Sequence, residues 1–302
     1  MCYYLLMLNS LITSMRPKQW TKNVFLIAAL VFDQQLTHID AALRTLYGFL
    51  LFCLFSGSVY LINDVMDIQY DRKHPVKRHR PIASGKLSKT IAIIFAALII
   101  IISLTLSYRL SPVFMWIGFS YLLINLFYSK WFKHIVIVDV LIIALGFVLR
   151  VAAGVSLISV ERFSPWLYVV TTLLALYLGF GKRRAELSLM EGEAKSHRRV
   201  LNGYSIEFLD QLITIVSSTT IISYSLYTFS APNLPENHTM MLTIPFVLYA
   251  IFRYLYLIQI KHAGGAPEEL LLTDRPLQVS IMLYGLSVIL IFYSEILINL
   301  IS

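Results

Sequence analysis

The sequence is short of cysteine and of charge. It has only two cysteines among 302 residues, Cys2 and Cys53, so neither a disulfide framework nor a cysteine metal site can form. Charged residues make up 14% of the chain, and no glycine- or proline-rich linker divides it, which predicts a single domain over residues 1–302. The seven histidines show no metal-binding spacing such as HExxH. Thiol chemistry and a histidine metal centre are therefore excluded.

What the chain has instead is long apolar runs. Hydrophobic residues account for 58% of it and the mean hydropathy is +0.72, too apolar for a water-soluble protein of this size. The runs lack the two-residue alternation of a membrane β-barrel, so the sequence predicts an all-α polytopic membrane protein. A span needs roughly 20 apolar residues, and nine segments qualify, at about 20–38, 41–64, 90–109, 112–129, 134–157, 164–181, 206–230, 240–260 and 277–300.

The basic residues gather in a few segments. Most of the 25 lysines and arginines lie in the N-terminal stretch and in the loops after the second, fourth, sixth and eighth runs. Because cytoplasmic loops carry the basic excess, nine spans predict a cytosolic N-terminus and an external C-terminus. The apolar start lacks the basic n-region and small-residue cleavage site of a signal peptide. Residues 1–19 are therefore expected to form a cytosolic interfacial segment.

The net charge of +8 is concentrated rather than spread over one soluble face, which argues against a nucleic-acid binder. Two long polar loops, at 65–89 and 182–205, hold much of it. Such loops favour a polyanionic substrate or an anionic lipid as partner. Four spans separate the two loops, a spacing consistent with two halves of one bundle that converge on a single site.

Three aspartates stand at the predicted cytosolic end of the second span, within Asn63-Asp64-Val65-Met66-Asp67-Ile68-Gln69-Tyr70-Asp71. On a continuous helix, Asp64, Asp67 and Asp71 lie at i, i+3 and i+7 and project from one face. Their hard oxygens suit Mg²⁺, whose shell is usually completed by substrate phosphates. The run predicts a magnesium–diphosphate site. The alternative is a solvated helix end whose acids balance the basic residues that follow.

This pattern, NDxxDxxxD after the second span, resembles the first aspartate-rich motif of the UbiA superfamily of intramembrane prenyltransferases, and the match is complete. The resemblance implies a bundle of about nine transmembrane helices with a cytosol-facing active-site cavity. It also implies that Asp64 and Asp67 hold Mg²⁺ on a diphosphate, while Asn63 and Asp71 orient or complete the shell. Tyr128 and Lys133, after the fourth span, fit that family as well.

The chain departs from that family after the sixth span, where a second acidic motif, DxxxD, is missing. Its place holds Gly181-Lys182-Arg183-Arg184-Ala185-Glu186-Leu187, with three cations and one acid. Such a group favours direct, charge-assisted binding of phosphate oxygens over a second metal bridge. A donor that carries a diphosphate and a further phosphate would use both groups. 5-Phosphoribosyl 1-diphosphate is such a donor.

Four sets of residues, at 16–23, 74–82, 181–187 and 274–278, resemble the decaprenyl-phosphate phosphoribosyltransferase branch of that superfamily. The resemblance implies Mg²⁺-dependent transfer of phosphoribose to a polyprenyl phosphate, in the bacterial plasma membrane and on the way to lipid-linked arabinose for cell walls. It leaves homo-oligomer formation open. The candidate substrate-binding residues are Gln19, Lys22, Lys73, Lys77, Arg78, Arg80, Tyr128, Lys133, Lys182, Arg183, Glu186, Arg253 and Arg275.

Ionisable groups are costly inside a membrane span, and we consider three charged residues within the predicted spans for a role in the site. Asp139 is either a wall of the site or the structural partner of a nearby base. Arg150 either snorkels outward or pairs internally. Arg253, about two turns from the end of the eighth span, is a candidate for the cavity wall.

Two other functions stay open. One is a conventional prenyltransferase that joins a polyprenyl diphosphate to an aromatic acceptor, and the missing second acidic motif speaks against it. The other is a transporter or lipid-binding protein without chemistry. That function is disfavoured because the polar groups gather at one membrane face, whereas transporters break helices at the midplane.

Overall fold

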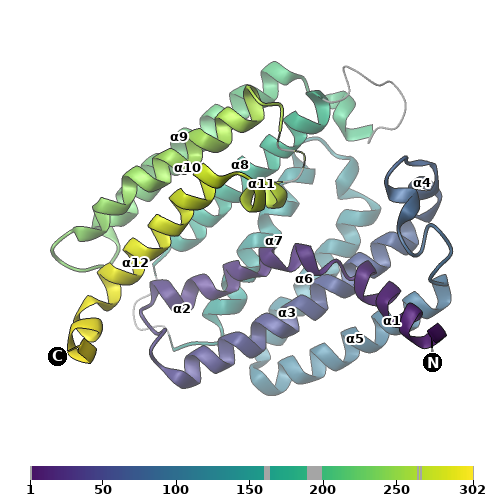
Figure 1. Ribbon diagram of the computed structural model, residues 1–302, viewed down its shortest axis with the longest axis horizontal. Coiled ribbons are helices and arrows are strands. Elements are labelled where there is room, and N and C mark those ends of the chain that lie inside the picture. Colours follow the sequence, from purple (N-terminus) through teal and green to yellow (C-terminus); the bar gives the residue numbers. More distant parts are fainter. Residues whose placement is uncertain (1, 160–163, 189–198, 264, 266, 302) are drawn as a thin grey trace. The chain divides into compact units, whose positions relative to one another are not determined.

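The computed structural model describes residues 2–159, 164–188, 199–263, 265 and 267–301, and side chains within 7–294 of these ranges except those of residues 199 and 268. All regular structure in this part of the chain is helical, which confirms the all-α prediction (Figure 1). Lys195 and Arg198, two of the basic residues counted in the second polar loop, lie outside the described residues.

The chain groups into two compact units, and each is built from three segments of sequence. Unit 1 comprises Met1–Ala28, His38–Lys133 and Leu149–Ser159. Unit 2 comprises Ala29–Thr37, His134–Val148 and Val160–Ser302. Helix α7 (Val138–Val155) contributes residues to both. The prediction of a single domain over 1–302 stays a prediction.

Unit 1 is organised around one long helix. Helix α3 (Ile39–Met66) packs against α5 (Lys89–Leu110) and α6 (Pro112–Lys130) (Figure 1). Its aromatic residues Phe52 and Phe55 are fully buried, in one core cluster with Phe114 and Tyr121. Gly154 on α7 touches the backbone of Leu26, since an added Cβ would stand 1.9 Å from that carbonyl oxygen. The described elements of unit 1 are α1 (Cys2–Ser14), the 3₁₀ helix η1 (Pro17–Ile27), α3 (Ile39–Met66), α4 (Ile68–Lys73), η2 (Lys77–His79), α5 (Lys89–Leu110) and α6 (Pro112–Lys130).

Local sequence explains where several helices begin. Ser88 accepts a hydrogen bond from the backbone N–H of Ile91 and starts α5. Ser111 caps α6 in the same way, and Pro112 follows it at the first helical position, where its missing N–H is harmless. Ser205 caps α9 (Ile206–Ser230) of unit 2. Serine at each cap satisfies a backbone donor that the helix itself leaves without a partner.

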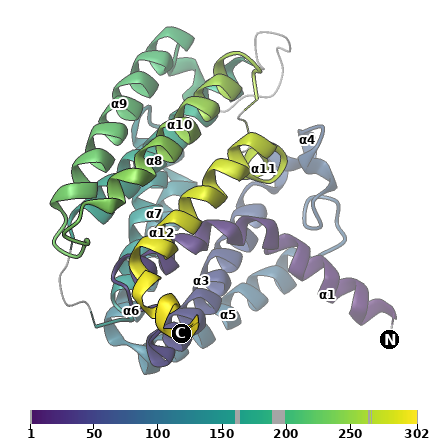
Figure 2. The same cartoon turned by 60° about the vertical axis from the view of Figure 1, so that its left-hand side comes forward.

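Unit 2 is a second helical bundle, in which α8 (Trp166–Ser188) packs along α9 and α10 (Ile244–Gln259) packs along α12 (Arg275–Ile301) (Figure 2). Its core includes Tyr177, Leu209, Ile213 and Ile258, each at most 1% exposed. The remaining described elements are α2 (Ala28–Phe32), η3 (Phe132–His134), η5 (Arg199–Gly203), η6 (Thr239–Thr243) and α11 (Pro267–Thr273), of which α2 and η3 begin in unit 1.

Seven helices of the described part are long and apolar enough to cross a membrane, so the protein is a multi-pass membrane protein. They match seven of the nine predicted segments. The segment near 164–181 lies in α8, whose last turns carry three consecutive basic residues, and α8 is not among the seven. The segment near 20–38 folds as η1 and the five-residue helix α2. The count of nine spans is not confirmed.

Candidate functional site

The acidic run of unit 1 is not one continuous helix. Helix α3 ends at Met66, Asp67 takes a non-helical conformation (φ −93°, ψ 7°), and the short helix α4 begins at Ile68. Backbone hydrogen bonds still connect the turns, from Asp67 N–H to the Asn63 carbonyl (2.9 Å) and from Asp71 N–H to the Asp67 carbonyl (2.8 Å). The expectation of one continuous helix through all three aspartates is therefore wrong, because Asp67 lies at the junction between α3 and α4.

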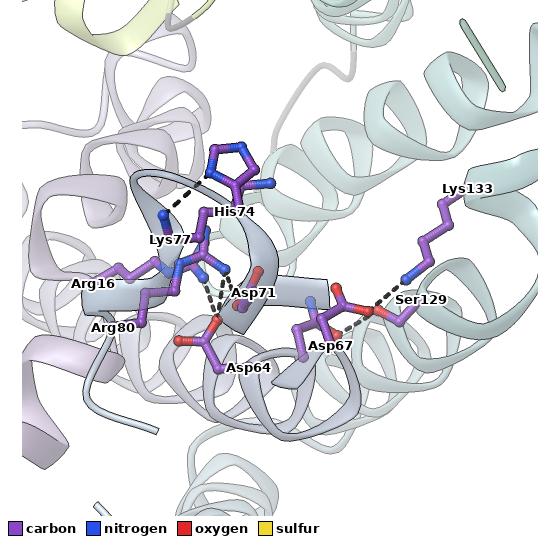
Figure 3. Close-up of polar contacts among 10 residues, drawn as sticks. Arg16, Asp64, Asp67, Asp71, His74, Lys77, Arg80, Ser129 and Lys133 are labelled. Atoms are coloured by element: carbon purple, nitrogen blue, oxygen red, sulfur yellow. Dashed lines mark hydrogen bonds and ion pairs between the residues drawn. The ribbon is translucent and has the colours of Figure 1, made fainter. Parts of the chain in front are cut away.

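Asp64 and Asp71 form one buried acidic pair, at 2% and 4% exposure. Arg80 bridges them, with Nη1 at 3.2 Å from Asp64 Oδ1 and 2.7 Å from Asp71 Oδ2. Arg16 Nη2 donates a second charge-assisted hydrogen bond to the same Asp64 oxygen (Figure 3). Two guanidinium groups thus compensate two carboxylates that burial would otherwise penalise.

Asp67 turns toward a different partner. Its side chain is 36% exposed, and Lys133 Nζ lies 2.9 Å from its Oδ1 (Figure 3). The neighbouring Asn63 accepts a hydrogen bond at Oδ1 from the hydroxyl of Ser129, in the last turn of α6. The end of α6 and the residues just after it therefore orient two side chains of the acidic run. Lys133 was singled out from the sequence, whereas Ser129 was not.

The loop after α4 is folded back so that Arg80 reaches the acids. Ile82, at 1% exposure, anchors it, and the Arg72 Nε donates to the Ala83 carbonyl at 3.1 Å. Leu87 N–H closes the loop on the Pro81 carbonyl at 3.0 Å. Gly85 has φ +82°, a conformation in which a Cβ would be strained. This fold explains how one cation contacts acids that lie 9 and 16 residues before it.

Arg16 is held by unusual backbone geometry. It has φ +54° and ψ +66°, the left-handed region, and Pro17 follows it at the start of η1. Its guanidinium carbon lies 4.8 Å from the centre of the Tyr60 ring, a cation–π contact. A non-glycine residue in this conformation costs free energy and is often found at functional sites. Sequence reasoning did not select Arg16 as a site residue.

Further predicted site residues of unit 1 have hydrogen bonds to other groups. Lys22 Nζ donates to Gln19 Oε1 at 2.6 Å, one turn after Arg16. His74 Nδ1 accepts backbone N–H bonds from Val76 and Lys77. Partial burial, followed by the charge of Lys77, lowers the pKa of His74, which keeps the ring neutral for this role. Three further candidates are half-buried or exposed on the same unit: Lys73, Arg78 and Tyr128.

In unit 2, the basic run of α8 is partly internal. Arg183 is 1% exposed, and its Nε lies 2.6 Å from Oδ2 of Asp139, which is 0% exposed. Its Nη1 lies 2.5 Å from Glu186 Oε2. The sequence predicts phosphate binding by Arg183, whereas the structure gives its guanidinium two carboxylate partners. Of the two interpretations of Asp139, structural partner of a base is the one the contacts support.

Tyr204 completes this network. Its hydroxyl donates to Asp139 Oδ1 at 2.8 Å and accepts the backbone N–H of Ile137 at 2.7 Å. Burial, followed by the hydrogen bond to Asp139, raises the pKa of Tyr204, so the phenol stays protonated. Ile137 itself has φ +68°, rare for a β-branched residue. Both oxygens of Asp139 are thus occupied, and the start of α7 is fixed.

Two further arginines of unit 2, Arg184 and the candidate Arg253, also have internal partners. Arg184 donates two hydrogen bonds to Asp210, from Nε to Oδ1 at 2.6 Å and from Nη2 to Oδ2 at 3.2 Å. Arg253 binds Asp274 at 3.1 and 2.8 Å, and Asp274 accepts the Leu277 N–H at the start of α12. Arg253 lowers the pKa of Asp274 through these hydrogen bonds. Lys182 and Glu186 are half-buried and Arg275 is exposed.

Arg150, in the unit 1 part of α7, pairs internally rather than snorkelling outward. It is 5% exposed, with Nε 2.8 Å from Asn23 Oδ1 and Nη2 3.0 Å from the Tyr121 hydroxyl. Its guanidinium carbon lies 4.9 Å from the centre of the Tyr121 ring. Asn23 in turn donates to Ser56 on α3 at 3.2 Å. This network ties η1, α3, α6 and α7 together inside unit 1.

The acidic run fits Mg²⁺ in a specific way. Within the residues described, no group of three or more His, Cys, Asp and Glu side chains is arranged to hold a metal ion. Mg²⁺ does not need such a cage, because it commonly takes one or two carboxylates and completes its shell with phosphates and water. Asn63, Asp64 and Asp67 each carry a side-chain oxygen of the hard type that Mg²⁺ prefers. The residues therefore fit a magnesium diphosphate better than a bare metal ion.

Comparison with known proteins gives a consistent result. The model of the UbiA prenyltransferase family matches residues 24–271. The decaprenyl-phosphate phosphoribosyltransferase of Mycolicibacterium smegmatis is 32% identical over 286 residues, 90% of this chain and 89% of the relative. The enzyme of that name from Corynebacterium glutamicum is 32% identical over 301 residues, 94% and 87% of the two chains.

Solved structures show the same fold. A UbiA homolog from Archaeoglobus fulgidus bound to GPP and Mg²⁺ aligns with a TM-score of 0.69 at 17% identity, covering 92% of this chain and 96% of the other. A structure of a UbiA homolog from the same organism bound to DMAPP and Mg²⁺ gives 0.70 at 19% identity, over 94% and 99%.

Proposed function

The chain belongs to the UbiA prenyltransferase family, and from this premise we propose that it transfers 5-phosphoribose from 5-phosphoribosyl 1-diphosphate to a polyprenyl phosphate, such as decaprenyl phosphate, releasing diphosphate. The observation that carries the proposal is the one-third identity, over nearly the whole length of both chains, to enzymes named for this transfer. The oxygen-rich acidic run among cations agrees with a diphosphate-bearing donor.

The chemistry needs positioning and charge more than proton transfer. The phosphate of the lipid acceptor is already ionised, so no general base is required. When bound, Mg²⁺ would supply positive charge that stabilises the leaving diphosphate. As the bond from ribose C1 to the diphosphate breaks, positive charge develops at C1, and a lipid phosphate oxygen attacks from the opposite face. Inversion at C1 to a β-linked product is expected.

The residues divide the work as follows. Asp64 and Asp67 would hold the metal, with Asn63 oriented by the Ser129 hydroxyl and Asp71 by Arg80. Lys133 and Lys22 are the candidates for binding phosphate oxygens. The cations at the end of α4 and in the loop after it would add attraction for the donor and for the lipid phosphate, as would Gln19 and Tyr128; these cations are Lys73, Lys77, Arg78 and Arg80.

We assign selection of the donor to residues 181–187 of α8, which stand where the family has its second acidic motif. Lys182 and Glu186 would bind the further phosphate and the ribose hydroxyl groups, because ammonium and carboxylate groups match those two chemistries. Arg183 fixes Glu186 through the 2.5 Å contact and is itself fixed by Asp139, so we assign it a positioning role. Arg253 and Arg275 flank Asp274, which caps α12.

The protein would work in the bacterial plasma membrane with its N-terminus and active site on the cytosolic side. The concentration of lysine and arginine in the loops around residues 72–89 supports this orientation. The donor is a water-soluble polyanion and the acceptor is a membrane lipid, so a site at the inner surface would meet both. The product would serve as a lipid-linked precursor of arabinose for the cell wall.

A transfer assay with purified protein tests the proposal. Protein in detergent, with Mg²⁺ and donor labelled in its ribose, should convert polyprenyl phosphate to a labelled lipid. If the acceptor phosphate carries ¹⁸O, that label should be retained in the phosphate between lipid and ribose. Use of a polyprenyl diphosphate with an aromatic acid, and no use of phosphoribosyl diphosphate, would overturn the proposal and indicate a conventional prenyltransferase.

Lys182→Ala gives a second test. It should weaken binding of phosphoribosyl diphosphate much more than binding of inorganic diphosphate, because its partner is the further phosphate. Loss of a charge-assisted hydrogen bond costs about 1.5–3 kcal/mol, or about ten- to hundredfold in affinity. Lys86→Ala, on an exposed loop of unit 1, is the matched control for loss of one positive charge. Equal losses for both ligands would remove the assigned role of Lys182.

A further inference from the structure

The three carboxylates of the acidic run each have a cation of the chain itself as partner. Arg16 and Arg80 contact Asp64, Arg80 also contacts Asp71, and Lys133 contacts Asp67 (Figure 3). A divalent ion that approaches these oxygens must therefore compete with positive groups already in contact with them. Two positive charges a few ångströms apart repel strongly where water is partly excluded.

These cations can change partner without leaving the site. The side chains of Arg16 and Arg80 are 28% and 26% exposed, so their guanidinium groups border solvent. Arginine binds phosphate in the same forked geometry in which it binds a carboxylate. A diphosphate that enters beside Asp64 offers anionic oxygens to both arginines. The carboxylate oxygens that they release then become available to the metal ion.

We propose that Arg16 is a diphosphate-binding residue and that, with Arg80, it makes binding of the divalent ion and of the diphosphate depend on each other. In the absence of diphosphate, the two arginines protect Asp64 and Asp71 from a bare metal ion. When diphosphate arrives, the arginines move to its oxygens as the metal ion takes the carboxylates. This inference rests on the proposed function only for the identity of the diphosphate as part of a donor.

The geometry of Arg16 supports a dedicated role. Its left-handed backbone, fixed between the Thr13 carbonyl and Pro17, directs the side chain from the α1–η1 junction onto Asp64, 48 residues away in sequence. The Tyr60 ring supports the guanidinium face at 4.8 Å and does not neutralise its charge. A residue that served only to balance Asp64 would duplicate Arg80, which already contacts that carboxylate.

The inference predicts a reciprocal coupling, because two ligands that help each other must do so by the same factor. Such couplings commonly amount to about five- to 150-fold in affinity. The probes are Mn²⁺, followed by electron paramagnetic resonance, and inorganic diphosphate, on full-length protein in detergent. Arg16→Gln should bind Mn²⁺ alone at least about fivefold more tightly than the unchanged protein, and diphosphate with metal more weakly.

Three further variants make the result specific. Arg16→Lys keeps the charge and should keep most of the coupling. Arg80→Gln should behave as Arg16→Gln does, and it provides a second measurement if the Arg16 variant fails to fold. Lys86→Gln loses the same charge on an exposed loop and should leave Mn²⁺ affinity unchanged. Because a purely structural loss would not tighten metal binding, the gain in Mn²⁺ affinity distinguishes the two explanations.

Mn²⁺ affinity that is no higher in Arg16→Gln and Arg80→Gln than in Lys86→Gln would overturn the inference. This outcome is separate from failure of the proposed function. A protein that transfers phosphoribose without the coupling would refute the role of Arg16 alone. A protein that shows the coupling but accepts only a prenyl diphosphate would retain the role of Arg16 and refute the proposed donor.

Discussion

Two arginine–aspartate networks, one in each unit, use the same chemical groups at very different burial. In unit 1, Arg16 and Arg80 are 28% and 26% exposed where they contact Asp64. In unit 2, Arg183 is 1% exposed and Asp139 is 0% exposed. The first network faces solvent through its cations, whereas the second is closed on both sides.

The difference teaches what burial does to an ion pair. Asp139 and Arg183 are shielded from water, so removing one of them leaves the charge of the other buried and uncompensated. A half-exposed arginine can exchange a carboxylate for a phosphate at small cost, because solvent screens the intermediate arrangement. Tyr204 strengthens the contrast by occupying the second oxygen of Asp139. The open network suits ligand exchange, and the closed one suits fixed positioning.

The largest expected effect is at Asp67, which belongs to the same acidic run as the open network. Asp67→Ala should abolish phosphoribosyl transfer while leaving the melting temperature in detergent nearly unchanged, because Asp67 is 36% exposed and its ion pair with Lys133 lies near the surface. Chelation of divalent ions should reproduce the loss. The measurements are labelled-lipid formation and thermal unfolding. Asp40→Ala, at the exposed other end of α3, is the matched control. Full turnover in Asp67→Ala would make this acid structural.

For the closed network, the main expected effect of a substitution is loss of fold stability. Arg183→Leu should destabilise the fold by about 3–5 kcal/mol, because it leaves Asp139 buried without its cation. The double variant with Asp139→Leu should recover part of that loss, since no uncompensated charge remains. Thermal unfolding in detergent measures both. A stable Arg183→Leu protein that loses only phosphoribosyl diphosphate binding would instead restore direct phosphate contact to Arg183.

A smaller effect is expected at Tyr204. Tyr204→Phe removes the donor to Asp139 and the acceptor of the Ile137 N–H, and each loss is of a single hydrogen bond. The expected destabilisation is about 1–2 kcal/mol. Faster hydrogen exchange at the Ile137 amide should accompany it and would locate the effect. Unchanged exchange there would mean that the left-handed turn at Ile137 is held by other contacts.

The smallest effect concerns a pair of intermediate burial. Arg253 and Asp274 are 26% and 11% exposed, and Arg253 lowers the pKa of Asp274 from its usual 3.8. The folded protein therefore binds fewer protons at this group than the unfolded chain does. The stabilisation is complete above pH 3.8 and is lost as the pH falls through the lower, folded-state pKa.

Melting temperatures of the unchanged protein and Asp274→Asn should accordingly differ at neutral pH and converge in strong acid. Glu269→Gln, which removes an exposed carboxylate from α11, is the control and should give parallel curves. A difference between the unchanged protein and Asp274→Asn that persists at every pH would assign the effect to the cap at Leu277 rather than to the charge of Asp274.

Much of the fold could be predicted because apolar length alone identifies membrane helices, and seven of the nine runs agree. The acidic motif was also found, since its spacing is local. The break at Asp67 was not, because counting residues along a helix assumes that the helix continues. The contact of Asp67 with Lys133 was not predicted either, because the two residues lie 66 positions apart.

The side chains that contact the acidic residues could not be predicted from the sequence. Arg16 meets Asp64 across 48 residues, Ser129 meets Asn63 across 66, and Tyr204 meets Asp139 across 65. Local patterns carry no information on such pairings. Arg183 illustrates the converse: a basic residue in a basic run suggests a ligand site, yet burial beside Asp139 turns it into a fixed support.

One feature of unit 1 makes the protein convenient for chemical mapping. Cys53 is 2% exposed, and its sulfur accepts a hydrogen bond from Asn23 at 3.2 Å, so aqueous maleimides should not reach it. Replacing Cys2 by serine would then give a background almost silent to labelling. Lys86→Cys places a single thiol just before the start of α5 (Lys89–Leu110), and Arg109→Cys places one at the end of the same helix. An impermeant reagent added to intact cells should label the second and spare the first, which would establish the sidedness of the helix from two measurements.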